Sequence, residues 1–476
     1  MSTTSQASQR IAALLDENSF VEIGAQVTAR STDFNLKQTE TPSDGVITGY
    51  GVIGGSLVYV YSQDASVLGG SVGEMHARKI ANLYDLALKM GAPVIGLIES
   101  AGLRLQEATD ALNGFGEIYK KQALCSGVIP QITAIFGSCG GGLALIPTLT
   151  DFTFMEEKKA KLFVNAPNAL EGNEISRCDT SAAAFQSKEA GIVDVVAAEG
   201  DILAKIRELV CMLPANNEDG VAIEECVDDL NRALEGMAGC AGDTSIALSL
   251  LSDSGAVFEV KENYAKEMIT AFIKLNGVTV GAVANRSEVY GEDGKVGEKF
   301  DAALTPAGCE KAAGFINFCD AFDIPVLSLT NVKGFKADKE SEKKIARAAA
   351  KLTYAFANAT VPKVNLIIGQ AFGSAYVAMN SKAIGADITM AWPEAQIGTM
   401  DGKLAAKIIC DGQGAEAIEK CAAEYAALQT GAANAAKRGY VDQIVEPEDT
   451  RKYVIGAFEM LLSKQEERPA KKHGTV

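Results

Sequence analysis

Histidine is nearly absent from this sequence. Only two of its 476 residues are histidines, His76 and His473. His473 lies in a charged C-terminal tail, and His76 lies in a segment that reads as a packed amphipathic helix. Enzymes of the Ser-His-Asp or Cys-His type need a histidine as general base, and neither position favours that role. No cluster of residues has the spacing of metal ligands either. We therefore expect chemistry without a histidine base and without a metal.

Other familiar signals are missing as well. The ten cysteines form no CxxC pair, and the first residues, MSTTSQASQR, lack the apolar core of a signal peptide. These features predict reduced thiols in a cytoplasm. The most apolar window, VIPQITAIFGSCGGGLALIP, is interrupted by two prolines, a glutamine and four glycines, so it does not read as a membrane span.

Nucleotide-binding signals are absent or misplaced. The sequence contains no GxxxxGK[ST] motif, which argues against nucleotide hydrolysis. The segment GYGVIG at 49–54 matches GxGxxG, but it lies between two predicted strands with no helix after it. A formal net charge of −17 argues against nucleic acid or an anionic membrane as partner. Any anionic ligand must be held by local basic groups or by backbone N–H donors.

The sequence does contain a long internal repeat. Pro93 and Pro325 stand in matching segments, as do Pro130 and Pro362, and each pair is 232 residues apart (325 − 93 and 362 − 130). Gly141 and Gly373 share the same offset. Two copies are too few for a solenoid. The repeat therefore predicts two related domains, which we place at residues 1–235 and 236–476.

Each copy has the rhythm of an α/β domain. Two strands meeting at a Gly-containing turn come first, followed by an amphipathic helix at 72–90 and short apolar strands of the kind buried in parallel sheets. The offset is only 222 between Gly55 and Gly277, so the second copy has about ten extra residues. We place them in the charged stretch GEDGKVGEKFDAA.

In both copies a buried strand leads into a glycine-rich turn and a helix of small residues, GSCGGGLAL and GQAFGSAY. The first N–H groups of a helix have no internal partner, and two such groups side by side form an oxyanion hole. Further donors could come from the segments SAGL and NVKGF. Glycines also permit close helix–strand packing, so one such turn alone would be weak evidence. Two turns at one offset favour a function.

Six segments of the chain closely resemble the carboxyltransferase subunits of biotin-dependent acyl-CoA carboxylases and decarboxylases. The segments are SDGVITGYG, YSQDASVLGGSVGEMHARKI, ESAGLRLQE, AYVAMNSK, AWPEAQIG and GYVDQIVEP. The similarity extends from about Ile11 to Pro447. It implies two tandem crotonase-type ββα-superhelix domains. It also implies transfer of a carboxyl group between biotin N1′ and the alpha carbon of an acyl-CoA.

The resemblance also assigns residues. The N-terminal domain would bind the CoA thioester, with its oxygen held by Gly141, Gly142 and Leu103. The C-terminal domain would hold the ureido oxygen of biotin at Ser374 and Ala375, next to Gly373. The remaining implied residues are Gly334 and Phe335 for biotin, Val377 for the choice of acyl chain, and Arg78, Lys79 and Arg104 for CoA phosphates.

Several positions depart from the family pattern. Leu103 replaces a usual alanine and Ser374 a usual glycine, while NVKGF, with Lys333, replaces an aspartate-valine-proline-glycine-phenylalanine stretch. LFVNAPNA stands where the family has leucine-threonine-glycine-proline. These departures favour a decarboxylase-type or unusual-substrate member over an ordinary propionyl-CoA carboxylase.

The resemblance implies partner proteins, and two alternative functions stay open. The chain has no biotin-acceptor motif and no ATP-grasp domain, so a biotin carboxyl carrier protein and either a biotin carboxylase or a membrane decarboxylase subunit must be separate chains. We expect a homodimer or homohexamer. A non-catalytic scaffold with this fold remains open, as does a simple crotonase-fold hydratase or hydrolase, although such enzymes usually have one domain and an acidic catalytic pair.

Overall fold

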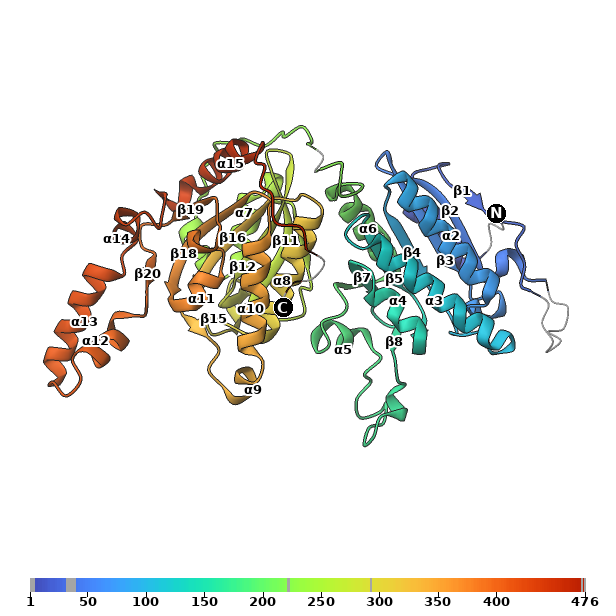
Figure 1. Cartoon of the computed structure of the whole chain (residues 1–476), viewed down its shortest axis with the longest axis horizontal. Coiled ribbons are helices and arrows are strands. Elements are labelled where there is room, and N and C mark those ends of the chain that lie inside the picture. The colour runs from blue at the N-terminus through green and yellow to red at the C-terminus, as the bar shows by residue number, and fades with distance from the viewer. Residues whose placement is uncertain (1–4, 31–39, 221–222, 292, 472–473, 475–476) are drawn as a thin grey trace. The chain divides into compact units, whose positions relative to one another are not determined.

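The computed structural model describes residues 5–30, 40–220, 223–291, 293–471 and 474. The chain forms two compact units, Met1–Ala222 and Ile223–Val476 (Figure 1). The boundary lies earlier than the position expected from the sequence, because residues 223–235 pack with the second unit. The N–H of Glu224 donates to the carbonyl of Gly277 at 3.0 Å, and Leu234 is fully buried in the core of that unit.

The first unit is built on a seven-stranded sheet in the order β1-β2-β3-β4-β5-β7-β9. The pairs among β1, β2 and β3 are antiparallel, and the remaining pairs are parallel. The strands are β1 (Val21–Ile23), β2 (Val46–Ile53), β3 (Ser56–Gln63), β4 (Val94–Ile98), β5 (Gln131–Ile135), β7 (Phe152–Glu156) and β9 (Val195–Ala197). A short parallel pair, β6 (Ser138–Gly140) and β8 (Lys161–Phe163), accompanies this sheet.

The first unit also contains helices, which alternate with the parallel strands along the chain. They are α1 (Gln6–Leu14), α2 (Glu74–Met90), α3 (Ala108–Cys125), α4 (Leu145–Thr148), α5 (Ala183–Lys188) and α6 (Glu199–Met212). Helix α2 ends at Gly91, which adopts φ +60°, a left-handed conformation that glycine tolerates at a helix C-terminus. Pro93 and strand β4 follow directly, as the sequence predicted. The strand VIGLI is buried at every residue, which fits its continuous apolar sequence.

The second unit repeats this architecture. Its main sheet has the path β10-β11-β12-β16-β18-β19-β21, again antiparallel for the first three strands and parallel afterwards. These strands are β10 (Val257–Val260), β11 (Met268–Leu275), β12 (Val278–Asn285), β16 (Val326–Val332), β18 (Lys363–Phe372), β19 (Ile388–Ala391) and β21 (Gln443–Ile444). The shorter strands are β13 (Glu288–Tyr290), β14 (Val296–Lys299), β15 (Ala303–Leu304), β17 (Gly334–Phe335) and β20 (Gln396–Gly398).

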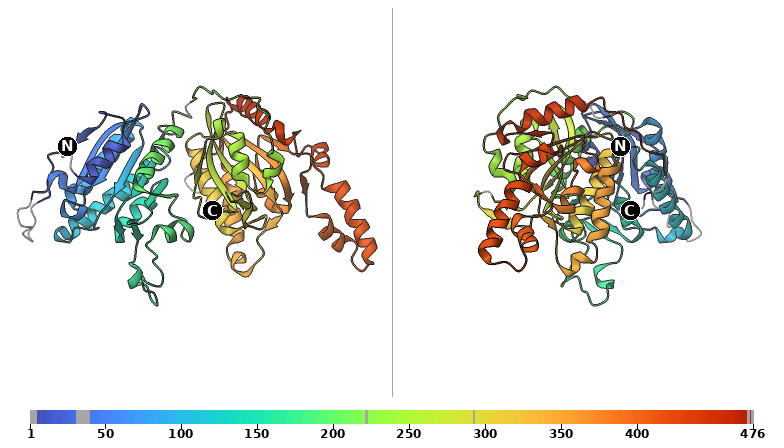
Figure 2. Two further views of the ribbon diagram at one scale, coloured as in Figure 1. Left: turned by 180° about the vertical axis from the view of Figure 1, so that it is seen from behind. Right: turned by 60° about the vertical axis from the view of Figure 1, so that its left-hand side comes forward.

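The second unit repeats the helices of the first and has further helices near its C-terminal end. They are α7 (Thr244–Leu251), α8 (Pro306–Ala321), α9 (Lys339–Glu342), α10 (Ile345–Asn358), α11 (Gly373–Ala378), α12 (Gly402–Ile409), α13 (Ala415–Gln429), α14 (Ala432–Lys437) and α15 (Thr450–Leu461). Helices α12 and α13 pack against each other and project from the rest of this unit (Figures 1 and 2). The extra charged residues predicted near 291–303 contain β14, which pairs with β13 just before them in an antiparallel hairpin.

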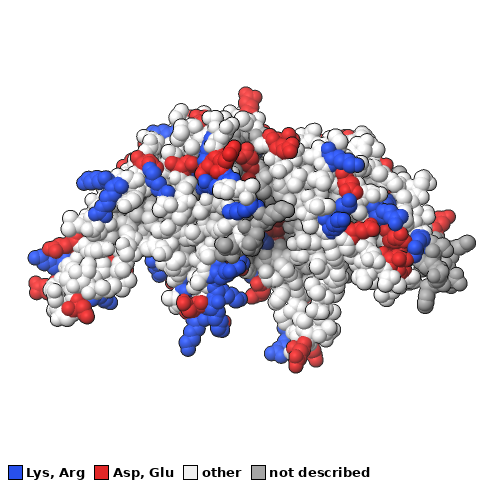
Figure 3. All heavy atoms as spheres, viewed as in Figure 1, with Lys and Arg blue, Asp and Glu red and all other residues white. Residues whose placement is uncertain are grey.

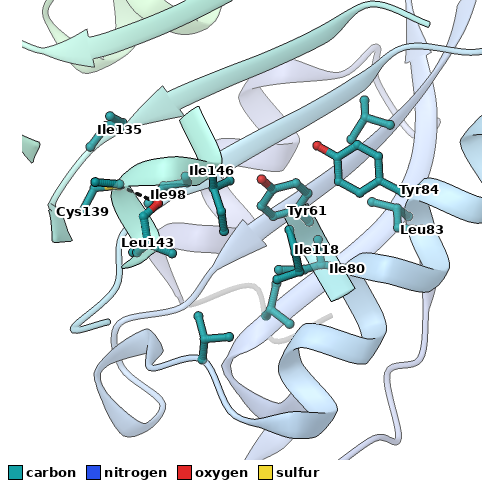
Figure 4. Packing of buried hydrophobic residues seen from close by; sticks show 14 of the residues in the cluster. Tyr61, Ile80, Leu83, Tyr84, Ile98, Ile118, Ile135, Cys139, Leu143 and Ile146 are labelled. Atoms are coloured by element: carbon teal, nitrogen blue, oxygen red, sulfur yellow. Dashed lines mark hydrogen bonds between the residues drawn. The ribbon is translucent and has the colours of Figure 1, made fainter. Parts of the chain in front are cut away.

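Each unit has its own apolar core. In the first, Tyr61 and Tyr84 are packed with aliphatic side chains from α2, α3 and the parallel strands (Figure 4). In the second, the core lies between the sheet and α7 and α15. In the described ranges, no helix is long and apolar enough to cross a membrane. Although the chain is acidic overall, Lys and Arg side chains gather around α9 on the face seen in Figure 3.

Candidate active site

The first glycine turn joins β6 to the short 3-10 helix η4 (Gly141–Ala144). Gly141 has φ +62°, and a Cβ added there would meet no atom within 4 Å. The backbone conformation, and not the available space, therefore requires glycine at this position. Cys139 and Leu143 point into the core on either side of the turn (Figure 4). Gly142 is fixed through its carbonyl, which accepts a hydrogen bond from Tyr119 Oη at 2.5 Å.

The second glycine turn is built in the same way. Gly373 also has φ +62°, and it opens helix α11 directly after β18. Ser374 is exposed, whereas Ala375 is buried with 1% of its surface accessible. The first three N–H groups of an α-helix have no acceptor within the helix. The sequence offset of 232 therefore corresponds to one backbone geometry used twice.

A loop beside each turn presents a further N–H group. In the first unit the N–H of Val72 donates to the carbonyl of Gly102 at 2.8 Å, and the N–H of Arg104 donates to the carbonyl of Val72 at 3.0 Å. These bonds form a parallel bridge in which Leu103 is the central residue. Because Gly102 and Arg104 make the bridge, the N–H of Leu103 points away from Val72.

The second unit reproduces this loop. Leu304 pairs with Phe335 in parallel register, and the N–H of Lys336 donates to the carbonyl of Leu304 at 2.9 Å. Leu304 and Phe335 are Val72 and Leu103 displaced by 232 residues (304 − 72 and 335 − 103). By the same reasoning the N–H of Phe335 points away from Leu304. β17 contacts α11, which brings this loop next to the Gly373 turn.

A buried ion network holds the first loop in place. The Arg104 guanidinium donates to Asp44 Oδ1 at 2.7 Å, to Glu107 Oε1 at 2.8 Å and to the carbonyl of Ser71 at 2.7 Å. All three charged side chains are at most 1% accessible. Burial raises the pKa of Asp44, and the neighbouring Arg104 opposes that shift. The network therefore fixes the backbone next to Leu103.

Each unit also contains a cavity; the lining of the second includes its glycine turn, whereas the lining of the first includes neither Gly141, Gly142 nor Leu103. In the second unit, a cavity of about 390 Å³ is lined by Gly373, Ser374 and Val377 together with residues of β20, α13 and the end of α14. In the first unit, a cavity of about 710 Å³ is lined by residues that include Ser43, Glu99 and 64–67. Both volumes fall in the range of small-molecule sites.

Comparison with known proteins now identifies the family. The sequence profile described as "Carboxyl transferase domain" matches residues 4–476. The chain is 38% identical over 494 residues to methylmalonyl-CoA decarboxylase subunit alpha of Propionigenium modestum, covering 99% of this chain and 92% of the relative. It is 39% identical over 491 residues to the propionyl-CoA carboxylase beta chain of Roseobacter denitrificans, covering 99% and 93%.

The chain belongs to the carboxyl transferase family. A solved structure agrees: the transcarboxylase 12S hexamer with hydrolysed methylmalonyl-CoA bound superposes with a TM-score of 0.92 at 34% identity, over 98% of this chain and 92% of that one. This agreement confirms the α/β fold, and the duplicated crotonase-type architecture expected from the sequence is consistent with it. The chain is thus a carboxyltransferase of the type found in acyl-CoA carboxylases and decarboxylases.

The basic residues expected near CoA lie in different environments. Arg78 is half-exposed and pairs with Glu74 at 2.8 Å. Lys79 is buried, where its Nζ donates to the carbonyls of Ser43 at 2.9 Å and Val46 at 2.5 Å and also contacts Ser43 Oγ. Burial lowers the pKa of Lys79 to about 8. For Lys79, and likewise for Arg104, contact with a CoA phosphate would require these interior bonds to break.

Within the part of the chain that the structure describes, the one histidine, His76, is an interior packing residue of the first unit. His76 is fully buried, its ring contacts Gln63 Nε2 and the carbonyl of Asp44, and burial lowers its pKa to about 3. It therefore stays neutral in a packed position. His473 lies outside the described residues.

Part of the cavity in the second unit is formed by residues that no sequence pattern had indicated. Gln429 and Tyr425 come from α13, and Arg438 and Tyr440 follow α14. A signal was available: the offset between the copies grows from 232 at the glycine turns to 248 between Asp194 and Asp442 (442 − 194). The lengthened segment begins after the second glycine turn and contains α12 and α13. Residues inserted there lie beside the turn and become part of its cavity.

Proposed function

We propose that the two glycine turns are two oxyanion holes that act on the two partners of a biotin-dependent carboxyl transfer. In the first unit, N–H groups of Gly141 or Gly142 and of Leu103 hold the thioester oxygen of an acyl-CoA. In the second unit, N–H groups of Ser374 and Ala375 hold the ureido oxygen of biotin, with Gly334, Phe335 and Gly373 beside them. The observation that carries this proposal is the repeated pairing of a positive-φ glycine turn with a bridged loop.

The chain's own residues supply polarisation and position. An N–H pair aimed at the thioester oxygen stabilises the charge that develops there when the alpha carbon becomes an enolate. Carboxylated biotin, on a separate carrier protein, would supply the carboxyl group and a base for the alpha proton. The cavity beside Ser374 suits a small bicyclic ring because it is walled by Tyr376, Tyr425 and Tyr440. No histidine or metal is needed for these tasks.

The acyl-CoA binds to the first unit in this proposal. The cavity of the first unit borders the loop 64–72. The N–H of Ala101, in the loop that contains Leu103, donates to the carbonyl of Gly69 at 2.9 Å and so links the two loops. Because the described lining of this cavity contains Glu22, Asp64 and Glu99 and no lysine or arginine, we expect the anionic phosphates of CoA to lie outside it. The relative named transcarboxylase 12S has methylmalonyl-CoA in its structure, which supports a malonyl-type thioester as the first substrate to try.

We also infer that the protein works as a homo-oligomer. Helix α12 exposes Leu404, Ile408 and Ile409, which are 49%, 62% and 63% accessible. A run of exposed large apolar residues on one helix is typical of an interface. The transcarboxylase 12S relative is described as a hexamer, which makes a second copy of this chain the favoured partner for α12.

The test is carboxyl transfer to free biotin. Full-length protein is incubated with methylmalonyl-CoA labelled in its free carboxyl group, and labelled carboxybiotin and propionyl-CoA are measured. We expect transfer that depends on the enzyme and saturates with the thioester. A non-catalytic scaffold would give no transfer above the rate without protein, with acetyl-CoA and malonyl-CoA tested in parallel to cover a different acyl preference.

A further inference from the structure

The cavity beside Ser374 contrasts with the acidic character of the chain. The protein has a formal net charge of −17. Among the described residues that line this cavity, none is a carboxylate, and one, Arg438, carries a positive charge. The other polar side chains are hydroxyls and an amide, from residues such as Thr399 and Gln429. A cavity with a cation and no acid in its lining favours an anionic ligand.

Arg438 is an exposed side chain that is oriented by an amide and pairs with no carboxylate among the described residues. Its Nη2 donates to Gln429 Oε1 at 2.8 Å. An amide oxygen orients a guanidinium but does not cancel its charge. By contrast, the buried Arg104 and Arg451 each lie against carboxylates, at 2.7 Å from Asp44 and 2.6 Å from Asp253. Since a guanidinium has five N–H donors, the bond to Gln429 leaves donors for a ligand.

The repeat provides an internal comparison. Asp194 and Asp442 occupy matching places, because each accepts a hydrogen bond from the N–H of a threonine in the neighbouring strand, at 2.6 and 2.9 Å. Counting back four residues from each aspartate gives Ala190 in the first unit and Arg438 in the second. The scaffold therefore does not require an arginine. The arginine is present only in the second unit, which is the unit that contains this cavity.

We propose that Arg438, oriented by Gln429, binds the carboxylate group that this enzyme transfers. This inference rests on the function proposed above and adds a subsite to it. A guanidinium matches a carboxylate with two parallel N–H···O bonds. The shared chemistry is a carboxylate on the malonyl-type acyl-CoA or on carboxylated biotin. Because CO₂ is neutral, Arg438 holds the group before transfer, so it acts on affinity and KM more than on kcat.

Paired ligands test this subsite directly. Affinities of the full-length protein are measured for methylmalonyl-CoA against propionyl-CoA and for N1-carboxybiotin against biotin, the members of each pair differing by one carboxylate. For Arg438→Ala we expect about a 10- to 100-fold loss for the carboxylated member of one pair, the size of a lost charged hydrogen bond. The uncarboxylated member should change by less than about twofold.

Two further variants complete the design. Lys437→Ala removes a neighbouring cation that does not line the cavity, and it should leave all four affinities unchanged. Arg438→Lys keeps the charge but loses the planar fork, and it should give an intermediate loss for the same ligand. If Arg438→Ala were poorly folded by circular dichroism, the Arg438→Lys affinities would carry the test.

The results distinguish the two possible carboxylate ligands, and they also distinguish failure of the Arg438 subsite from failure of the proposed function. A loss confined to methylmalonyl-CoA identifies the acyl-CoA carboxylate, and a loss confined to carboxybiotin identifies the biotin carboxylate. Equal losses within both pairs, no loss, or an equal loss in Lys437→Ala would overturn the subsite. If the wild-type protein transferred no carboxyl group, the proposed function would fail, while the binding pairs would still decide whether Arg438 recognises a carboxylate.

Discussion

The buried network around Arg104 leads to a quantitative prediction. Replacing Arg104 with methionine removes the partner of both Asp44 and Glu107 while keeping much of the side-chain volume. Breaking a buried ion pair by removing one partner costs about 3–5 kcal/mol, because the remaining charge is left uncompensated. Here two carboxylates are left, each with no more than 1% of its side chain accessible. We expect Arg104→Met to lower the unfolding free energy of the first unit by at least this amount at pH 8.

The cost should depend on pH with a definite sign. The folded-state pKa of Asp44 is raised by burial, so its protonated form favours folding at low pH, and this contribution is lost as the pH rises through the folded pKa. Removing Arg104 raises that pKa further. The destabilisation by Arg104→Met should therefore be smaller at pH 5 than at pH 8, and Asp44→Asn should partly rescue it.

The assay uses two probes. Urea unfolding is followed by hydrogen exchange of α2 amides for the first unit, and by fluorescence of the single tryptophan, Trp392, for the second. The matched control is Arg78→Met, which breaks an exposed ion pair with Glu74 and should cost at most about 1 kcal/mol. Equal costs for the two arginines, or a larger cost at pH 5, would show that Arg104 does not stabilise the first unit by pairing with buried carboxylates.

Three further predictions concern other regions. Val377→Asp should change the ranking of acetyl-, propionyl- and longer acyl-CoA thioesters in side-by-side kinetics if the acyl chain also reaches the second-unit cavity that Val377 lines; an unchanged ranking would leave that cavity to biotin alone. Burial raises the pKa of Asp151 to about 7, so its contribution to stability is lost as the pH rises through 7. Asp151→Asn should flatten the dependence of urea midpoint on pH between 5 and 8, and a parallel curve would contradict this. Ile408→Glu should shift light-scattering mass to smaller species, unlike Lys407→Glu on the same helix.

The repeat could be predicted because matching prolines and glycines share one offset. The glycine turns could be predicted because their backbone conformation depends on the residues next to them. A strand followed by a glycine cluster and a small-residue helix needs a positive-φ residue at the turn, and Gly141 and Gly373 both adopt φ +62°. The boundary at 222 was harder to place. Turn-rich residues such as 223–235 look like a linker, although Leu234 is fully buried in the second core.

Other features depend on tertiary contacts that no local pattern reveals. Arg104 follows an oxyanion segment and reads as a surface cation available to CoA. Its interior position depends on Asp44, sixty residues away in the chain. Arg438 and Gln429 are nine residues apart and meet where α14 contacts α13.

The two proposed oxyanion holes can be disabled separately. Gly142→Val crowds the first turn, since even a Cβ at this position lies 3.1 Å from Tyr119 Oη. Ala375→Pro deletes an N–H in the first turn of α11, where proline costs no helical hydrogen bond. Each variant is assayed, with biotin present, for exchange of the propionyl-CoA alpha proton in heavy water and for CO₂ release from carboxybiotin.

We expect the two variants to differ in which activities they keep. Gly142→Val should slow proton exchange by about 100- to 1,000-fold, the effect of losing one oxyanion donor, and leave CO₂ release largely intact. Ala375→Pro should slow CO₂ release by a similar factor and have a small effect on binding of propionyl-CoA to the first unit. If both folded variants lost both activities equally, or lost neither, the assignment of one hole to each half of the chain would be wrong.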